Sequence, residues 1–215
     1  PSNLIAMELI RAGGGYISAP SANTSGRPSP TLAEHVAEDL GGKIDMILDG
    51  GAVEIGLEST ILDMTVTPPM ILRPGAITAE MFEEVIGKVD VDETLLVAES
   101  EKAPKAPGMK CRHYAPKAKL MIVEGDLREE IFAIRQLAYK AYKEGRKVGV
   151  IATTETLPFY KYGVVKNIGT RENEKTIARN LYRVLREFDE EDVEEIYSES
   201  FAAQGIGKAI MNRLE

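Results

Sequence analysis

Hydrophobic and polar residues alternate with a helical period in two stretches near the start of the chain. Residues 3–12 are apolar on nearly every side, which predicts a helix that is buried on several faces. Residues 31–40 carry a single apolar stripe, and Thr31 and Glu34 have the spacing of a capping box. We therefore expect a helix there with Thr31 as its N-cap. His35 lies off the apolar stripe, so its side chain is expected to be solvated.

Three short apolar runs predict strands in the same part of the chain. They cover residues 46–48, 59–62 and 70–72, and turns rich in glycine or proline separate them. A further amphipathic helix is expected over 78–86, where Gly87 ends it. Short strands mixed with helices indicate an α/β or α+β unit that is built on a sheet of several short strands.

This pattern breaks at residues 99–118 and then returns as a regular alternation of strands and helices. Residues 99–118 carry three prolines and no hydrophobic periodicity, which is typical of an extended, semi-rigid linker. Beyond the linker, strands are expected at 120–123, where the strand should be buried, and at 148–151, 164–165 and 195–197. Amphipathic helices are expected after Asp126, over 172–188 and from Gly205.

The alternation predicts a small Rossmann-like domain with a doubly wound parallel sheet. No glycine-rich phosphate fingerprint follows its first strand, so we assign no dinucleotide to it and expect a structural or regulatory role. The whole chain is thus an α/β protein in three parts: residues 1–98 form one unit, 99–118 a linker, and 119–215 the Rossmann-like domain.

Composition excludes several classes of function. With 44% hydrophobic and 28% charged residues among 215, the chain is typical of a globular protein, and no apolar run is long enough to span a bilayer. The single cysteine, Cys111, excludes an intrachain disulfide and fits a reducing compartment, so a cytoplasmic protein is expected. One cysteine and two histidines make a Cys/His zinc site unlikely to form.

Charge is distributed unevenly along the chain. Residues 1–98 contain 5 basic and 15 acidic side chains, whereas 117–215 contain 17 of each. The acidic excess indicates either a solvated surface or cationic partners in a part of the protein outside this sequence. No block of basic residues offers a footprint for a phosphate backbone, so direct nucleic-acid binding is not expected.

The loop at residues 18–31 is the first candidate for chemistry. It contains Ser21, Asn23, Ser25 and Ser29, together with a glycine and an arginine. Such a loop can direct backbone N–H groups, hydroxyls and the start of a helix toward one anion. An ordinary polar turn remains the alternative, because serine, asparagine, glycine and proline are also the usual turn residues.

Further candidates follow the loop. Arg73 ends an apolar run and is followed by proline and glycine, so it can present a rigid guanidinium to phosphate or carboxylate, although a surface ion pair is equally compatible. Ser59 can donate a hydrogen bond to a small polar ligand from the start of a strand. In the linker, Lys110 is followed by Arg112, His113 and Tyr114, a cationic and aromatic group that could cover an anionic nucleotide or simply be a solvated basic segment.

Taken together and in order, these motifs resemble the threonylcarbamoyl-adenylate synthase family. The matching segments are Ala-Pro-Ser-Ala-Asn-Thr-Ser-Gly-Arg-Pro-Ser-Pro-Thr at 19–31, Ile-Leu-Asp-Gly-Gly at 47–51, Leu-Glu-Ser-Thr-Ile at 57–61, Leu-Arg-Pro-Gly-Ala-Ile-Thr at 72–78, and 106–116 with 205–213. The likeness is to two-domain members, in which a Rossmann-like domain follows a YrdC-type catalytic domain with a twisted α/β sheet.

The resemblance implies an activity and its substrates. Members are nucleotidyltransferases that form threonylcarbamoyl-adenylate and pyrophosphate from L-threonine, bicarbonate and ATP, with Mg2+ expected beside the triphosphate. The product would pass to the complex that transfers the threonylcarbamoyl group to tRNA. Such chemistry depends on alignment and charge neutralisation, so the lack of a His/Asp pair or a zinc site agrees with it.

The resemblance also implies roles for individual residues. Contacts to ATP are expected from Ser21, Asn23, Ser29, Arg73, Arg112, His113 and Tyr114. Of these, Ser21, Asn23 and Arg73 are expected to be catalytic, with Arg73 on a phosphate. The threonine pocket is expected to include Ser59 and the backbone of Ala19.

The chain departs from the family pattern in two places. No Lys-x-Arg pair precedes Ser21, so we expect the chain to be the C-terminal portion of such an enzyme and to be nearly inactive alone. Cys111 stands where many relatives carry an aromatic residue or histidine. Two other functions remain open: a non-catalytic module that binds nucleotide or docks onto the tRNA-modification machinery, and carbamoyl transfer in hydrogenase maturation. Proteins of the latter kind do not resemble residues 106–215.

Overall fold

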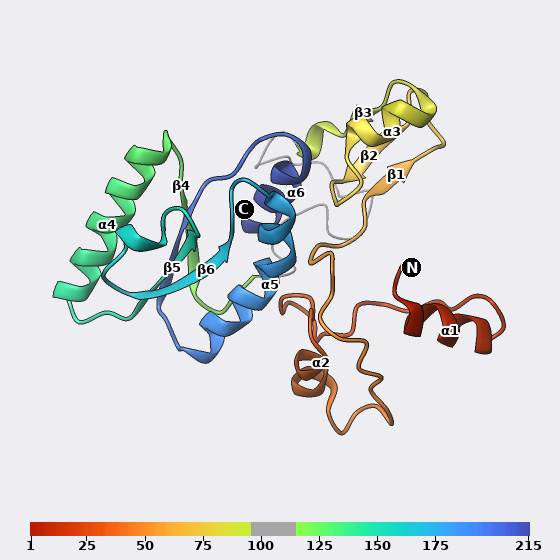
Figure 1. Cartoon of the computed structure of the whole chain (residues 1–215), viewed down its shortest axis with the longest axis horizontal. Helices are drawn as coiled ribbons and strands as arrows, with labels where there is room; N and C mark the ends of the chain where they lie inside the picture. Colours follow the sequence, from red (N-terminus) through yellow and green to blue (C-terminus); the bar gives the residue numbers. More distant parts are fainter. Residues whose placement is uncertain (96–114) are drawn as a thin grey trace.

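A computed structural model of the chain describes residues 1–95 and 115–215 (Figure 1). The first range, here called the N-terminal segment, contains one small sheet in the order β1-β2-β3. Strands β1 and β2 are antiparallel, and β3 is parallel to β2. Its elements are α1 (Leu4–Ala12), α2 (Ala33–Leu40), β1 (Ile61–Asp63), β2 (Met70–Arg73), α3 (Ala79–Ile86), β3 (Asp90–Val91) and the 3-10 turn η1 (Glu93–Leu95).

Residues 115–215, here called the C-terminal unit, form a four-stranded sheet in the order β4-β7-β5-β6. All of its strand pairs are parallel, which confirms the predicted Rossmann-like fold. Helix α4 covers one face of the sheet, and α5 and α6 cover the other (Figure 1). The elements are β4 (Lys119–Val123), α4 (Leu127–Lys143), β5 (Val148–Thr153), η3 (Leu157–Phe159), β6 (Val164–Gly169), α5 (Glu174–Glu190), β7 (Glu195–Glu199) and α6 (Gly205–Leu214).

The sequence pattern explains most of the C-terminal unit. Strand β5 is buried along its whole length, as its continuous apolar run indicates. Asp126 caps α4 in a capping box with Glu129, and the apolar face of α4 packs on the sheet. Strand β4, which was expected to be buried, is an edge strand with exposed side chains at Lys119 and Met121.

One residue of the N-terminal segment, Leu57, packs into the hydrophobic core of the C-terminal unit. Leu57 is buried together with side chains of α5. The residue before it, Gly56, runs so close to α5 that a Cβ atom there would lie 2.3 Å from the carbonyl oxygen of Ala178. Only glycine permits this approach, because the obstacle is the backbone of a helix. The segment that leads to β1 is therefore fixed against the C-terminal unit.

Several predictions for the N-terminal segment are wrong. Residues 46–48 form no strand and are largely exposed, and β1 begins at Ile61, two residues later than expected. Helix α1 is present, yet none of its residues is buried, and Leu4 is 76% exposed. Among the residues that the structure describes, no other element packs extensively on α1, so its apolar side chains lack the burial that their pattern indicates.

The start of α2 also differs from the prediction. Its N-cap is Leu32, without a side-chain capping bond, so Thr31 is not the cap. Instead, the backbone N–H of Thr31 donates to Nδ1 of His35 at 3.1 Å. His35 is buried rather than solvated, and burial together with the nearby Arg186 guanidinium lowers its pKa. The neutral ring is thus an internal acceptor that joins the loop at 18–31 to α2.

Neither range of described residues contains a helix that is both long and apolar enough to cross a membrane.

Candidate functional site

The loop at residues 18–31 is an ordered turn that is fixed from within and from α2. The side-chain amide of Asn23 donates to the carbonyl oxygens of Thr24 and Arg27, at 3.0 and 3.3 Å. The N–H of Thr24 donates to the Asp39 carboxylate at 3.1 Å, and the Arg27 guanidinium pairs with the same carboxylate. The loop therefore keeps one shape, which an anion-binding loop requires if its donors are to converge.

Arg186 of α5 completes this anchor from the C-terminal unit. Its Nη2 atom donates to Asp39 at 2.8 Å and to the carbonyl oxygen of Pro28 at 2.6 Å. Both charged side chains are almost fully buried, with 1% and 0% of their surface exposed. Burial by itself would raise the pKa of Asp39. The hydrogen bonds from Arg186 and from the Thr24 N–H outweigh burial and hold the pKa below its usual value, so the carboxylate stays ionised.

Glu58 is a second junction, located immediately before the predicted threonine-side residue Ser59. One carboxylate oxygen of Glu58 accepts the Ser29 hydroxyl at 2.7 Å. The other accepts the Tyr182 hydroxyl and Nε of Arg213, both at 2.8 Å. Three segments that are distant in sequence therefore meet at one partly buried carboxylate.

Arg73 ends β2 and points toward the Glu58–Thr60 segment. Its Nε and Nη2 atoms donate to the carbonyl oxygen of Ser59, at 3.1 and 2.9 Å. Two residues later, a Cβ atom at Gly75 would lie 2.6 Å from both the Glu58 oxygen and the Thr60 nitrogen, so only glycine fits. The Arg-Pro-Gly turn is thus packed directly against the residues that precede β1, and this contact gives the guanidinium a fixed direction.

The structure brings together some of the predicted site residues and leaves others apart. Ser59 and Arg73 are in contact, and Ser29 joins them through Glu58. Ala19 and Ser21 are exposed, and neither donates to or accepts from Arg73 in the described ranges. Oδ1 of Asn23 is a buried acceptor for which residues 1–95 and 115–215 supply no hydrogen-bond donor.

The remaining predicted residues, Arg112, His113 and Tyr114, lie outside the described residues, as do Lys110 and Cys111. Their predicted place over a nucleotide therefore stays a prediction.

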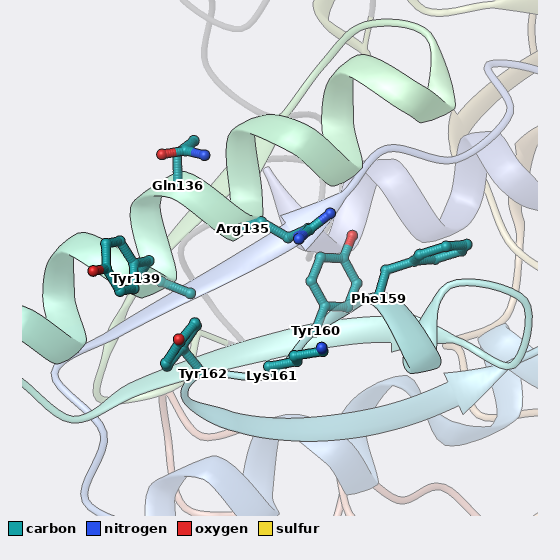
Figure 2. A pocket seen from close by; sticks show the side chains of 8 residues that line it. Arg135, Gln136, Tyr139, Phe159, Tyr160, Lys161 and Tyr162 are labelled. Atoms are coloured by element: carbon teal, nitrogen blue, oxygen red, sulfur yellow. The ribbon is translucent and has the colours of Figure 1, made fainter.

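Two cavities lie in the described part of the chain, and none of the residues predicted to bind ATP or threonine lines the larger of these two. One of about 380 Å³ lies between the two parts of the chain, beside the Arg73 turn, and its walls include Pro74, Leu95, Lys208 and Asn212. The other, of about 110 Å³, lies between α4 and the segment from η3 to β6. Figure 2 shows the rings of Tyr139 and Tyr162 at one end of this second cavity and Phe159 at the other. None of the residues predicted to bind ATP or threonine lines it.

Sequence reasoning missed the acidic and basic residues that hold the loops. These residues are Asp39, Glu58, Arg186 and Arg213. Glu58 and Arg213 lie in segments that the sequence singled out, but neither was given a role there. Two cations that pair with acidic side chains of the N-terminal segment come from α5 and α6.

The ionised state of Glu58 predicts how stability depends on pH. Burial would raise the pKa of Glu58, but the Arg213 charge and the hydrogen bonds from Arg213 and Ser29 hold it below the usual value. A carboxylate with a lowered folded pKa stabilises the protein above its unfolded pKa of about 4.3 and loses that contribution as pH falls through the folded pKa. We expect the free energy of unfolding to decline below about pH 4, and Glu58→Gln to reduce that decline. Urea titrations of both proteins at a series of pH values test this, and equal slopes would contradict it.

Comparison with known proteins gives two family matches that together cover nearly the whole chain. A family described as the C-terminal domain of threonylcarbamoyl-AMP synthase matches residues 77–215, and one described as telomere recombination matches residues 1–75. The chain is 48% identical to the threonylcarbamoyl-AMP synthase of Bacillus subtilis and 45% identical to that of Pyrococcus abyssi. Each alignment includes all of this chain but only 60% and 61% of the relative.

A solved structure agrees with these matches. The crystal structure of Pyrococcus abyssi Sua5 complexed with L-threonine superposes on the chain with a TM-score of 0.88 at 44% identity. The superposition covers 100% of this chain and 61% of that one. The similarity therefore extends over both the N-terminal segment and the C-terminal unit, and the chain spans about three fifths of the proteins it resembles.

Proposed function

The chain belongs to the threonylcarbamoyl-AMP synthase family, and from that membership we propose that it contributes residues to the ATP and threonine sites of an enzyme making threonylcarbamoyl-AMP and pyrophosphate. The proposed substrates are L-threonine, bicarbonate and ATP. The product would pass to the complex that modifies tRNA, without direct contact between this chain and nucleic acid. The single cysteine favours a reducing compartment such as the cytoplasm.

The proposed reaction joins two substrates at one phosphorus atom. The threonine amine attacks the carbon of bicarbonate or of CO2 derived from it, and the bicarbonate oxygen leaves as water, which gives a carbamate. A carbamate oxygen then attacks the α-phosphate of ATP, and pyrophosphate leaves with the electron pair of the broken P–O bond. Anions react in the second step, so the protein must align them and neutralise charge rather than supply an acid–base pair.

The single observation that carries the proposal is the contact between Arg73 and Ser59. The carbamate forms on threonine and must reach the α-phosphate, so the threonine and ATP sites have to adjoin. Arg73 is proposed to bind phosphate and Ser59 to line the threonine pocket, and the guanidinium donates two hydrogen bonds to the Ser59 carbonyl oxygen. Because this guanidinium is already held in one orientation, the side chain loses little conformational entropy when it binds a phosphate.

Other residues have proposed roles in the same site. Ser21 and Asn23 would contact ATP from the ordered loop, and the buried Oδ1 of Asn23 is an acceptor suited to a donor on the substrate. Ser29 would contribute from beside Glu58, and the backbone of Ala19 would face threonine. Arg112, His113 and Tyr114 of the proposed linker at 99–118, between units 1–98 and 119–215, would close over the nucleotide.

Mg2+ is proposed to enter with the triphosphate as part of the substrate, since such ions are held mainly by phosphates and one or two carboxylates. Residues 1–95 and 115–215 contain no group of three or more histidine, cysteine, aspartate or glutamate side chains placed to hold a metal. No step above is assigned to the ion.

The proposal is tested by the dependence of pyrophosphate release on each substrate. In the protein as encoded by its gene, we expect pyrophosphate to form from ATP only when threonine and bicarbonate are both present, because the carbamate is the nucleophile. The 215-residue chain alone, which spans about three fifths of these relatives, is expected to be nearly inactive. A coupled pyrophosphate assay with each substrate omitted in turn makes the measurement. Release of pyrophosphate without threonine would contradict the proposal.

A further inference from the structure

Arg213 of α6 lies at the point where the proposed ATP and threonine segments meet the C-terminal unit. Its guanidinium is buried, with 3% of the side chain exposed. Nη2 donates to the carbonyl oxygen of Pro74 at 2.9 Å, and Nε donates to Glu58 at 2.8 Å. One planar group thus binds the backbone after Arg73 and the side chain before Ser59.

These two bonds lie on either side of the contact between Arg73 and Ser59, which carries the proposed function. Arg73 donates to the Ser59 carbonyl oxygen, and Arg213 holds the residue next to each of them. A shift of Pro74 relative to Glu58 would therefore change the direction of the Arg73 guanidinium. Because a displacement of about 1 Å at a reacting group can cost a large part of catalysis, this bracing affects the reaction and not only the fold.

Charge gives Arg213 a second effect at the same place. Glu58 is an ionised carboxylate that accepts the hydroxyl of Ser29, a residue proposed to face ATP. An unpaired carboxylate there would repel a triphosphate, and the repulsion is strongest where water is excluded. Arg213 neutralises Glu58, with the Tyr182 hydroxyl as a further donor. Both donors come from the C-terminal unit, on α5 and α6.

We propose that Arg213 is a positioning residue for the reaction, through which the C-terminal unit directs Arg73 and neutralises Glu58 beside the ATP site. This inference rests on the proposed function. It assigns part of the catalytic geometry to the C-terminal unit, for which the sequence indicated only a structural or regulatory role. Arg213 itself touches no substrate in this account; it acts through Pro74 and Glu58.

The test compares Arg213→Gln and Arg213→Lys in the protein as encoded by its gene. Arg213→Gln should lower kcat/KM for ATP about 10- to 100-fold, mainly through kcat, because the direction of Arg73 counts most in the transition state. Arg213→Lys should lose less, since its ammonium neutralises Glu58 but cannot hold Pro74 with a planar fork. The double variant Glu58→Gln/Arg213→Gln should recover part of the loss, because no unpaired carboxylate remains.

The matched control is Arg146→Gln, which removes an arginine that pairs with Glu144 and Glu195. It should stay within about twofold of the parent protein. Parent activity with unchanged kcat/KM in a folded Arg213→Gln overturns the inference and leaves the proposed function standing. If Arg213→Gln does not fold, the same kinetic comparison is made with Arg213→Lys, and an unchanged kcat/KM in that variant overturns the inference. If the parent protein shows no threonine-dependent release of pyrophosphate, both the proposed function and the inference about Arg213 are wrong.

Discussion

Replacing Arg73 with alanine is expected to lower kcat for threonylcarbamoyl-AMP formation by about 100- to 1000-fold, which is the usual cost of removing one fixed donor from developing charge. The fold should persist, because Arg73 is only half-buried at the end of β2. Steady-state pyrophosphate release by the protein as encoded by its gene gives kcat, and circular dichroism verifies the fold.

Two further variants make the Arg73 result specific. Arg73→Lys keeps the charge but not the planar fork, so it should recover only part of the lost kcat. Arg183→Ala removes another arginine, whose guanidinium pairs with Glu187 of its own helix, and should leave kcat nearly unchanged. If Arg73→Ala turns over normally but no longer binds a partner of the tRNA-modification machinery, the chain is a docking module and not a catalytic one.

The C-terminal unit was predictable because its local and tertiary preferences agree. The apolar stripe of α5, with Ile177, Leu181 and Leu185, is buried, and the cap at Asp126 starts α4 where the sequence indicates. A fully buried strand such as β5 needs a continuous apolar run, and the sequence has one. Each element could therefore be placed without knowing its neighbours, apart from β4, whose edge position depends on strand order.

The N-terminal segment was less predictable because burial there depends on contacts between distant residues. His35 lies off the stripe of α2, yet it is buried because Arg186 and Asp39 close over that side of the helix. An apolar triplet at 46–48 has strand propensity, but a strand also needs a partner for its backbone, and none pairs with it in the described ranges. Propensity alone cannot supply that partner.

The site was predictable at its motif residues and not at their supports. The sequence singled out Ser59 and Arg73, and the structure places them in contact, while their roles toward ATP and threonine stay predictions. Arg186 lies between Leu185 and Phe188 on a helix whose apolar face is clear, so the pattern gives no reason to expect a buried charge there. What stabilises that charge is Asp39, which is distant in sequence, and a single sequence cannot pair the two.

That buried pair should produce the largest change in stability. Arg186→Met is expected to lower the free energy of unfolding by about 3 kcal/mol, near the lower limit for breaking a buried pair, because Asp39 keeps Arg27 and the Thr24 N–H as partners. Loss of the bonds from Arg186 to the Pro28 carbonyl oxygen should loosen the loop at 18–31 as well. Urea denaturation at pH 7, followed by circular dichroism, measures the change.

A pair of variants separates the buried charge from simple loss of packing. Arg183→Met, one helical turn before Arg186 and partly exposed, should change the free energy of unfolding by no more than about 0.5 kcal/mol. Arg186→Met/Asp39→Leu should be more stable than Arg186→Met alone, because the Asp39 carboxylate, although it keeps Arg27 and the Thr24 N–H, has lost its buried cation. If the double variant is instead less stable than the single one, the bonds from Arg27 and the Thr24 N–H outweigh the cost of the buried charge, and the loss in Arg186→Met does not come from the carboxylate.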